Sequence, residues 1–133
     1  MNFTGQKVLI NIGQQNAFEF LGNFNNFEKL MPDQVTNWKS DMDKCSFDIQ
    51  GMTSISLKYS NKIASHLIEI VPDGKSPISF SLQLNIEPSP DRAEKSVVWI
   101  KIDTDLNPMI AIIAKRPLEN LVNVMSEKLK TLF

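Results

Sequence analysis

Apolar and polar residues alternate through the middle of the chain. The clearest run covers residues 78–86, in which every second residue is Ile, Phe or Leu and the residues between them are Ser, Gln or Asn. A period of two places alternate side chains on opposite faces of a strand. Similar runs occur at residues 45–49, 55–59, 66–70 and 98–102, separated by turn-forming Asp, Gly and Pro residues. Because the connections are short, we expect consecutive strands to pair antiparallel into one sheet with a single apolar face.

The residues before this region predict one strand and two short helices. Residues 3–12 are rich in apolar and β-branched side chains, which is typical of a strand. Residues 14–21 carry apolar side chains at helical spacing. A second helix is expected to start at Asn25, with Glu28 in the capping-box position, and to stop at Pro32.

The last part of the chain predicts a long helix in two parts. Asn107 followed by Pro108 suits a helix N-terminus. The second half has a single apolar stripe, whereas the first half is apolar on nearly every side. Pro117 lies between them, and proline removes a helical hydrogen bond and clashes with the preceding turn. We therefore expect a kink or break at Pro117, with residues 107–115 bent over one end of the sheet and residues 117–132 packed on it.

The order of these elements resembles the helix-grip fold of the START-like superfamily, also called SRPBCC. AFEFL at residues 17–21, NFNNFEKLMP at residues 23–32 and VTNW at residues 35–38 are similar to the first helix, proline and tryptophan-containing strand of this group. NPMIAIIAKRPLENLV, at residues 107–122, resembles the closing helix of small bacterial members. The resemblance spans residues 1–133 and implies a single α+β domain. Its curved antiparallel sheet of about six to seven strands would wrap around the C-terminal helix.

The resemblance also implies a deep cavity between sheet and helix, which members use for lipids, sterols, quinones, polyketides or plant hormones. We therefore expect noncatalytic binding of a small hydrophobic ligand that is lipid-, quinone- or polyketide-like, with residues 107–115 as a movable lid. The predicted ligand-binding residues face the interior: Trp38, Phe47, Ile55, Leu57, Tyr59, His66, Ile68, Phe80, Leu82, Leu84, Ile100, Met109, Ile113, Leu121, Val122 and Met125.

Two other functions stay open. His66 is the single histidine, and its phase would place it on the apolar face with Ile68. There it could act with Tyr59 as the acid and base of a cyclase- or dehydratase-like enzyme. A histidine at a strand end or on the surface is the other interpretation. Alternatively, a protein-interaction module with a filled cavity would use Trp99, whose phase points to the outer face of the sheet.

The charge and composition of the chain argue against several classes of binding partner. The chain has 14 Lys and Arg residues and 15 Asp and Glu residues, so its net charge is -1, and it has no run of basic residues. This composition disfavours binding to nucleic acid. The sequence has no group of His and Cys residues at metal-ligand spacing, so neither a metal nor a cofactor is expected. Cys45 is the single cysteine and cannot form an internal disulfide. With no signal peptide pattern and no run of roughly 20 apolar residues, we expect a cytoplasmic protein without stable membrane insertion.

Overall fold

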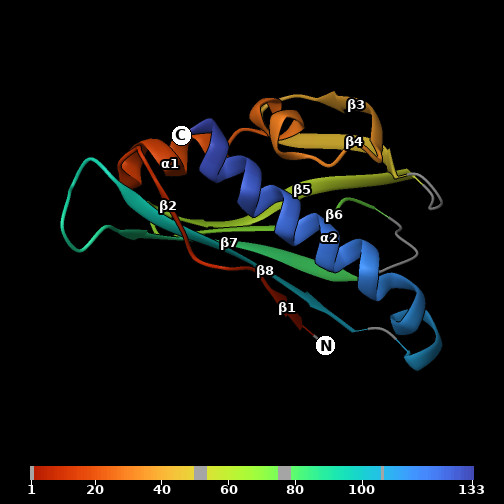
Figure 1. The fold of residues 1–133 in the computed structure, drawn as a ribbon. Helices are drawn as coiled ribbons and strands as arrows, with labels where there is room; N and C mark the ends of the chain where they lie inside the picture. Colours follow the sequence, from red (N-terminus) through yellow and green to blue (C-terminus); the bar gives the residue numbers. More distant parts are fainter. Residues whose placement is uncertain (1, 50–53, 75–78, 106) are drawn as a thin grey trace.

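The computed structural model describes residues 2–49, 54–74, 79–105 and 107–133. Among these residues, eight strands form one antiparallel sheet and a long helix crosses it (Figure 1). The strands are β1 (Asn2–Thr4), β2 (Val8–Ile10), β3 (Val35–Ser40), β4 (Lys44–Ile49), β5 (Ser54–Ile63), β6 (Leu67–Pro72), β7 (Phe80–Pro88) and β8 (Ser96–Thr104). The helices are α1 (Gln14–Leu21), the 3-10 helix η1 (Phe24–Leu30) and α2 (Pro108–Leu132). This confirms the predicted α+β helix-grip architecture.

The sheet runs in the order β1-β8-β7-β6-β5-β4-β3, and β2 also pairs with β8. The predicted first strand is therefore split in two along one edge, with Phe3 opposite Ile102 and Val8 opposite Val98. The split lies at Gly5, where an added Cβ would lie 2.7 Å from Cγ1 of Val122. A glycine at this point lets the edge of the sheet pass directly under α2. Since β1 and β2 share one edge, the sheet is seven strands wide, as expected.

The alternating pattern produces one buried face. Leu82, Leu84 and Ile86 of β7 are buried, while the residues between them are partly exposed; Ile78, which begins the predicted run, lies outside the described residues. Burying each such side chain contributes about 1.5–3 kcal/mol. The buried stripe of α2 packs over this face, and Figure 1 shows the helix lying diagonally across the sheet.

The two short helices lie between β2 and β3, and the second one differs from its prediction. Asn23, not Asn25, is its cap, because the Asn23 side chain accepts a hydrogen bond from the Asn25 N–H at 2.9 Å. The element is a 3-10 helix, with Phe24, Phe27 and Leu30 buried. These side chains anchor η1 in the core below α2.

The C-terminal helix is a single element. The Asn107 side chain accepts a hydrogen bond from the Ile110 N–H at 3.0 Å, and Pro108 occupies the first turn, as predicted. The expected division into two helical segments is wrong, because α2 continues through Pro117. Ala114 and Leu118, on either side of this proline, are both buried, so packing holds the helix together where it lacks a hydrogen bond. No helix in the described ranges is both long and apolar enough to cross a membrane.

Candidate ligand-binding site

The position of α2 leaves room over part of the sheet. Its Cα atoms come within 8 Å of those of β1, β2, β8 and η1, and this holds for no Cα of β3 to β7 in the described residues. Side chains must therefore fill the space between α2 and the strands on that side.

A closed apolar cavity of about 40 Å³ lies in this space. At this volume it has room for roughly one water-sized group, and an apolar cavity offers water no hydrogen-bond partners. Side chains from four strands, from α2 and from the end of η1 surround it: Met31, Phe47, Ile49, Ile55, Leu57, Phe80, Leu82, Ile102, Pro117, Leu118, Leu121 and Met125.

An open groove of about 250 Å³ lies next to this cavity. Ile49, Pro117 and Leu121 line both spaces, so these three side chains form a wall between them. We call these three residues the throat. The groove is polar on its outer side and apolar at the throat, and its lining is Pro32, Gln34, Val35, Ile49, Arg116, Pro117, Asn120 and Leu121.

Pro117 makes the helical side of the throat a weak point. A proline at this position has no N–H to donate to the carbonyl of Ile113, one turn earlier. The helix therefore lacks one hydrogen bond at the place where the groove and the cavity meet. Bending α2 here costs less than bending it elsewhere.

Seven of the predicted ligand-binding residues line the closed cavity: Phe47, Ile55, Leu57, Phe80, Leu82, Leu121 and Met125. Four others are buried in the same core but outside this lining: Ile68, Leu84, Ile100 and Val122. Sequence reasoning left out Met31, Ile49, Ile102, Pro117 and Leu118. Three of these had a usable signal, because Leu118 belongs to the apolar stripe of α2, and Ile49 and Ile102 continue the alternation of β4 and β8.

Tyr59 is engaged by the fold. Its hydroxyl donates to the Leu21 carbonyl at 2.7 Å, and its ring stacks on Phe24 with centroids 4.2 Å apart. The Lys62 ammonium lies 4.1 Å from the centroid of the same ring. Burial raises the pKa of the Tyr59 hydroxyl, with smaller contributions from Cys45 and Asp43. The residue therefore links α1 to the sheet.

His66 lies on the surface, and its predicted place beside Ile68 on the apolar face is wrong. It belongs to the turn between β5 and β6, where Ser65 has a φ of 65°, so the alternation begins only after it. Its Nδ1 lies 3.1 Å from Nε2 of Gln14. Tyr59 pairs with Ile70 four residues from the end of β5, about 13 Å along the strand. The geometry does not bring His66 and Tyr59 together as an acid and base.

Three further predicted residues lie away from the cavity lining. Trp38 stacks on Phe47 with ring centroids 5.3 Å apart, and its buried Nε1 has no hydrogen-bond partner among the described residues. Met109 and Ile113 were expected inside but are 79% and 76% exposed. Because α2 does not break, the inward phase of Leu118 continues back to the preceding turns, and the inward positions there belong to alanines.

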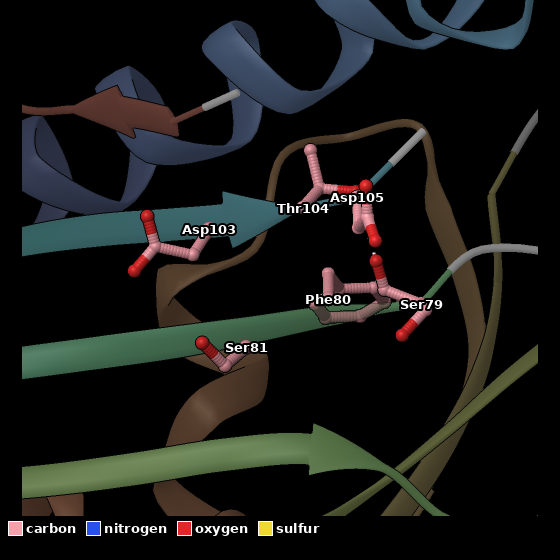
Figure 2. Close-up of a pocket in the computed structure, with 6 residues that line it drawn as sticks. All are labelled: Ser79, Phe80, Ser81, Asp103, Thr104 and Asp105. Atoms are coloured by element: carbon pink, nitrogen blue, oxygen red, sulfur yellow. Dashed lines mark hydrogen bonds between the residues drawn. The ribbon is translucent and has the colours of Figure 1, made fainter. Parts of the chain in front are cut away.

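A second, open depression of about 390 Å³ lies at the end of β7 and β8 (Figure 2). Thr104 Oγ1 donates to the Ser79 carbonyl at 2.8 Å, and Asp103 is paired with Lys101 at 3.6 Å. Its other lining residues are Phe80, Ser81 and Asp105. No group of three potential metal ligands occurs in the described part of the chain. The depression is shallow and polar, so the apolar cavity is the stronger candidate site.

Comparison with known proteins gives a fold. No family model matches the sequence, and no curated protein matches it. Among solved structures, the chain is similar to a conserved protein from Geobacillus kaustophilus, with a TM-score of 0.71 and 12% identity over 98% of this chain and 93% of that one. It is also similar to a START superfamily protein from Mycobacterium smegmatis, with a TM-score of 0.68 and 11% identity over 99% of both chains.

A third similar structure is a point mutant of norcoclaurine synthase from Thalictrum flavum in complex with a transition-state analogue. Its TM-score is 0.69, with 8% identity over 97% of this chain and 93% of that one. These three structures match the fold of this chain over nearly its whole length. The chain therefore has the START-like, or SRPBCC, helix-grip fold.

Proposed function

We propose that this protein binds and carries a small amphipathic ligand between the sheet and α2, without catalysing a reaction. The observation that carries the proposal is the throat, Ile49, Pro117 and Leu121, at which an open groove meets a closed apolar cavity. Movement of these few side chains would join the two spaces. The norcoclaurine synthase complex supports the proposal, because a protein of this fold holds a small organic molecule.

The lining suggests the chemistry of the ligand. The inner wall is entirely apolar, which suits an aliphatic or aromatic body that gains free energy by leaving water. The outer rim carries Gln34, Arg116 and Asn120. Arg116 is exposed and has no ion pair or hydrogen bond among the described residues, so it is available for an anionic group. A carboxylate with an apolar tail fits both parts.

Entry requires the closed cavity to expand, because typical ligand pockets hold roughly 300–1,000 Å³. Met31 and Met125 line the cavity, and methionine adapts to new shapes at low cost because its side chain is unbranched. The missing hydrogen bond at Pro117 allows the first half of α2 to move away from the throat. The carrier would thus open at Pro117 and close over its ligand.

The test begins with native mass spectrometry of the purified protein to detect a bound small molecule. Titration with dansylaminoundecanoic acid, followed by its fluorescence, then measures binding directly. Leu121→Trp should fill the throat and weaken binding by at least about tenfold, which corresponds to 1.4 kcal/mol. Leu132→Trp, an exposed position on the same helix, is the matched control and should bind like the wild type.

Two results would contradict the proposal. One is a protein that carries no small molecule and does not bind the probe. The other is a Leu121→Trp variant that keeps its fold by circular dichroism and binds with unchanged affinity.

A second candidate function rests on the small volume of the closed cavity. If side chains already fill the interior, the fold can serve as a protein-interaction module through its outer sheet face. Trp99 is half-buried on that face, with the Lys7 ammonium 4.5 Å from its ring centroid. An empty protein in the binding test, together with a complex that Trp99→Ala abolishes, would favour this function over carrying.

A further inference from the structure

The first half of α2 places its small residues inside and its large apolar residues outside. Ala111 and Ala114 face the core and are 6% and 2% exposed. Met109, Ile112 and Ile113 are 79%, 80% and 76% exposed. This is the reverse of an ordinary surface helix, in which large apolar side chains face the core.

The exposed residues form one continuous surface, which we call the outer stripe: Met109, Ile112, Ile113 and Arg116. Their spacing of i, i+3, i+4 and i+7 puts them on one side of the helix. Ile110 lies beside the stripe and is 39% exposed. Isoleucine is a poorer helix former than alanine, lysine or glutamine, so these residues do not stabilise the isolated helix. An exposed apolar cluster of this kind marks an interaction site.

The charged residues in the first half of α2 are both cations, with Asp105 before this stretch and Glu119 after it. Residues 108–116 contain Lys115 and Arg116 and no Asp or Glu. Both cations are exposed, and neither has an ion pair or hydrogen bond among the described residues. The net charge of the protein is -1, so this basic end is a local feature. The surface therefore suits a partner that is both apolar and negatively charged.

We propose that the outer stripe docks on the surface of a phospholipid bilayer that contains anionic lipids. The first half of α2 would lie in the plane of the interface, with Met109, Ile112 and Ile113 among the acyl chains. Lys115 and Arg116 would then lie at the level of the lipid phosphates. Figure 1 shows the first turns of α2 at the end of the molecule away from α1, where a flat surface can approach them.

The unpaired charges of this surface match an anionic bilayer better than a second copy of this chain. A two-fold antiparallel pairing of outer stripes would bury the apolar side chains, but residues 108–116 of the second copy add only Lys115 and Arg116 again, and the carboxylates of Asp105 and Glu119 lie outside this stretch. Anionic lipids supply both the apolar phase and the negative charge. Arg116 also lines the groove, so a docked bilayer would lie beside the throat.

The test is flotation of the protein with vesicles of phosphatidylcholine and phosphatidylglycerol in a ratio of about 7:3, compared with phosphatidylcholine alone. The wild type should float with the mixed vesicles and much less with the neutral ones. The double substitution Ile112→Gln and Ile113→Gln should reduce flotation by at least about tenfold, because it removes the apolar contact. Lys115→Gln should weaken flotation with the mixed vesicles and leave flotation with the neutral vesicles unchanged.

The matched control is Leu132→Gln, at the opposite end of the same helix, where the leucine is 43% exposed. It should float like the wild type. The assay needs no soluble ligand, so its result is independent of carrying. Failure of the wild type to float, or flotation unaffected by the double substitution, would overturn the proposal. So would a wild-type dimer that the double substitution converts to a monomer, because the outer stripe would then be a self-association surface.

Discussion

At the scale of single residues, the polar side chains that could have served chemistry are largely used by the fold. Tyr59 joins β5 to the end of α1 through its hydroxyl group. Asn107 caps α2, and Ser96 Oγ donates to the Ile12 carbonyl at 2.8 Å. His66 stands on the surface, apart from the cavity. These polar side chains therefore serve the fold.

The Tyr59 hydrogen bond gives a direct prediction. Tyr59→Phe keeps the ring that stacks on Phe24 but leaves the Leu21 carbonyl without its donor. Loss of one partner of a buried hydrogen bond costs about 1–3 kcal/mol, so the free energy of unfolding in urea should fall by that amount. Ser56→Ala, at an exposed position on β5 whose side chain has no hydrogen bond among the described residues, should change it by less than about 0.5 kcal/mol. An unchanged free energy of unfolding in Tyr59→Phe would mean that the hydroxyl does not stabilise the fold.

Cys45 predicts a loss of stability in alkali. Burial raises the pKa of its thiol from an ordinary value of 9.0 to about 12. Above pH 9 the unfolded state loses this proton while the folded state keeps it, so the unfolded state binds fewer protons and stability falls with pH up to about 12. The stability difference between wild type and Cys45→Ala should therefore shrink across this range in urea titrations. A constant difference would show that the thiol ionises equally in both states.

At the scale of elements, the strands could be predicted from the sequence and the phase of α2 could not. Alternation identifies the buried face of β7 and β8 because successive side chains of a strand point to opposite faces of the sheet. A helix segment that is apolar on all sides does not show which side faces the core, so the sequence could not reveal that Met109 and Ile113 point outward. The deciding fact is that α2 continues through Pro117, which depends on packing of Ala114 and Leu118 against the rest of the fold.

The candidate site was predictable to a similar extent. Inward strand residues such as Phe47 and Leu57 followed from their period, and they line the cavity. The turn before β6 moved His66 to the surface, because turn geometry at Ser65 interrupts the period without a Gly or Pro signal. Arg116 and Asn120 gave no local pattern, since their place on the groove depends on how α2 meets the segment before β3.

Replacing Pro117 tests how far this proline weakens α2. Pro117→Ala restores the hydrogen bond to the Ile113 carbonyl and should raise the free energy of unfolding, by up to about 3 kcal/mol. Hydrogen exchange of amides in residues 112–117 should slow at the same time. If the protein carries a ligand as proposed, the stiffer helix should also slow exchange of the dansyl fatty acid. Unchanged or lower stability would indicate that the proline ring contributes packing at the throat that alanine cannot replace.

At the scale of the whole molecule, the three helices meet at one end of the sheet. The ring edge of Phe20 in α1 contacts Phe133 with centroids 4.9 Å apart, and Lys128 donates to the Met31 carbonyl at 2.5 Å. The C-terminal end of α2 is thus fixed to α1 and to the end of η1, whereas the buried residues of its first half are alanines. This difference between the two halves of α2 fits the proposed opening at Pro117.

The pairing of β1 with β8 also sets an order of events during synthesis. Phe3 finds its partner Ile102 only after nearly the whole sheet has been translated. At roughly 5–20 residues per second, the first strand waits for several seconds, and the apolar face stays uncovered until α2 follows. During that interval the nascent chain exposes unpaired strand edges, which are prone to aggregation. We therefore expect the growing sheet to need shielding, for example by chaperones, until its last helix emerges.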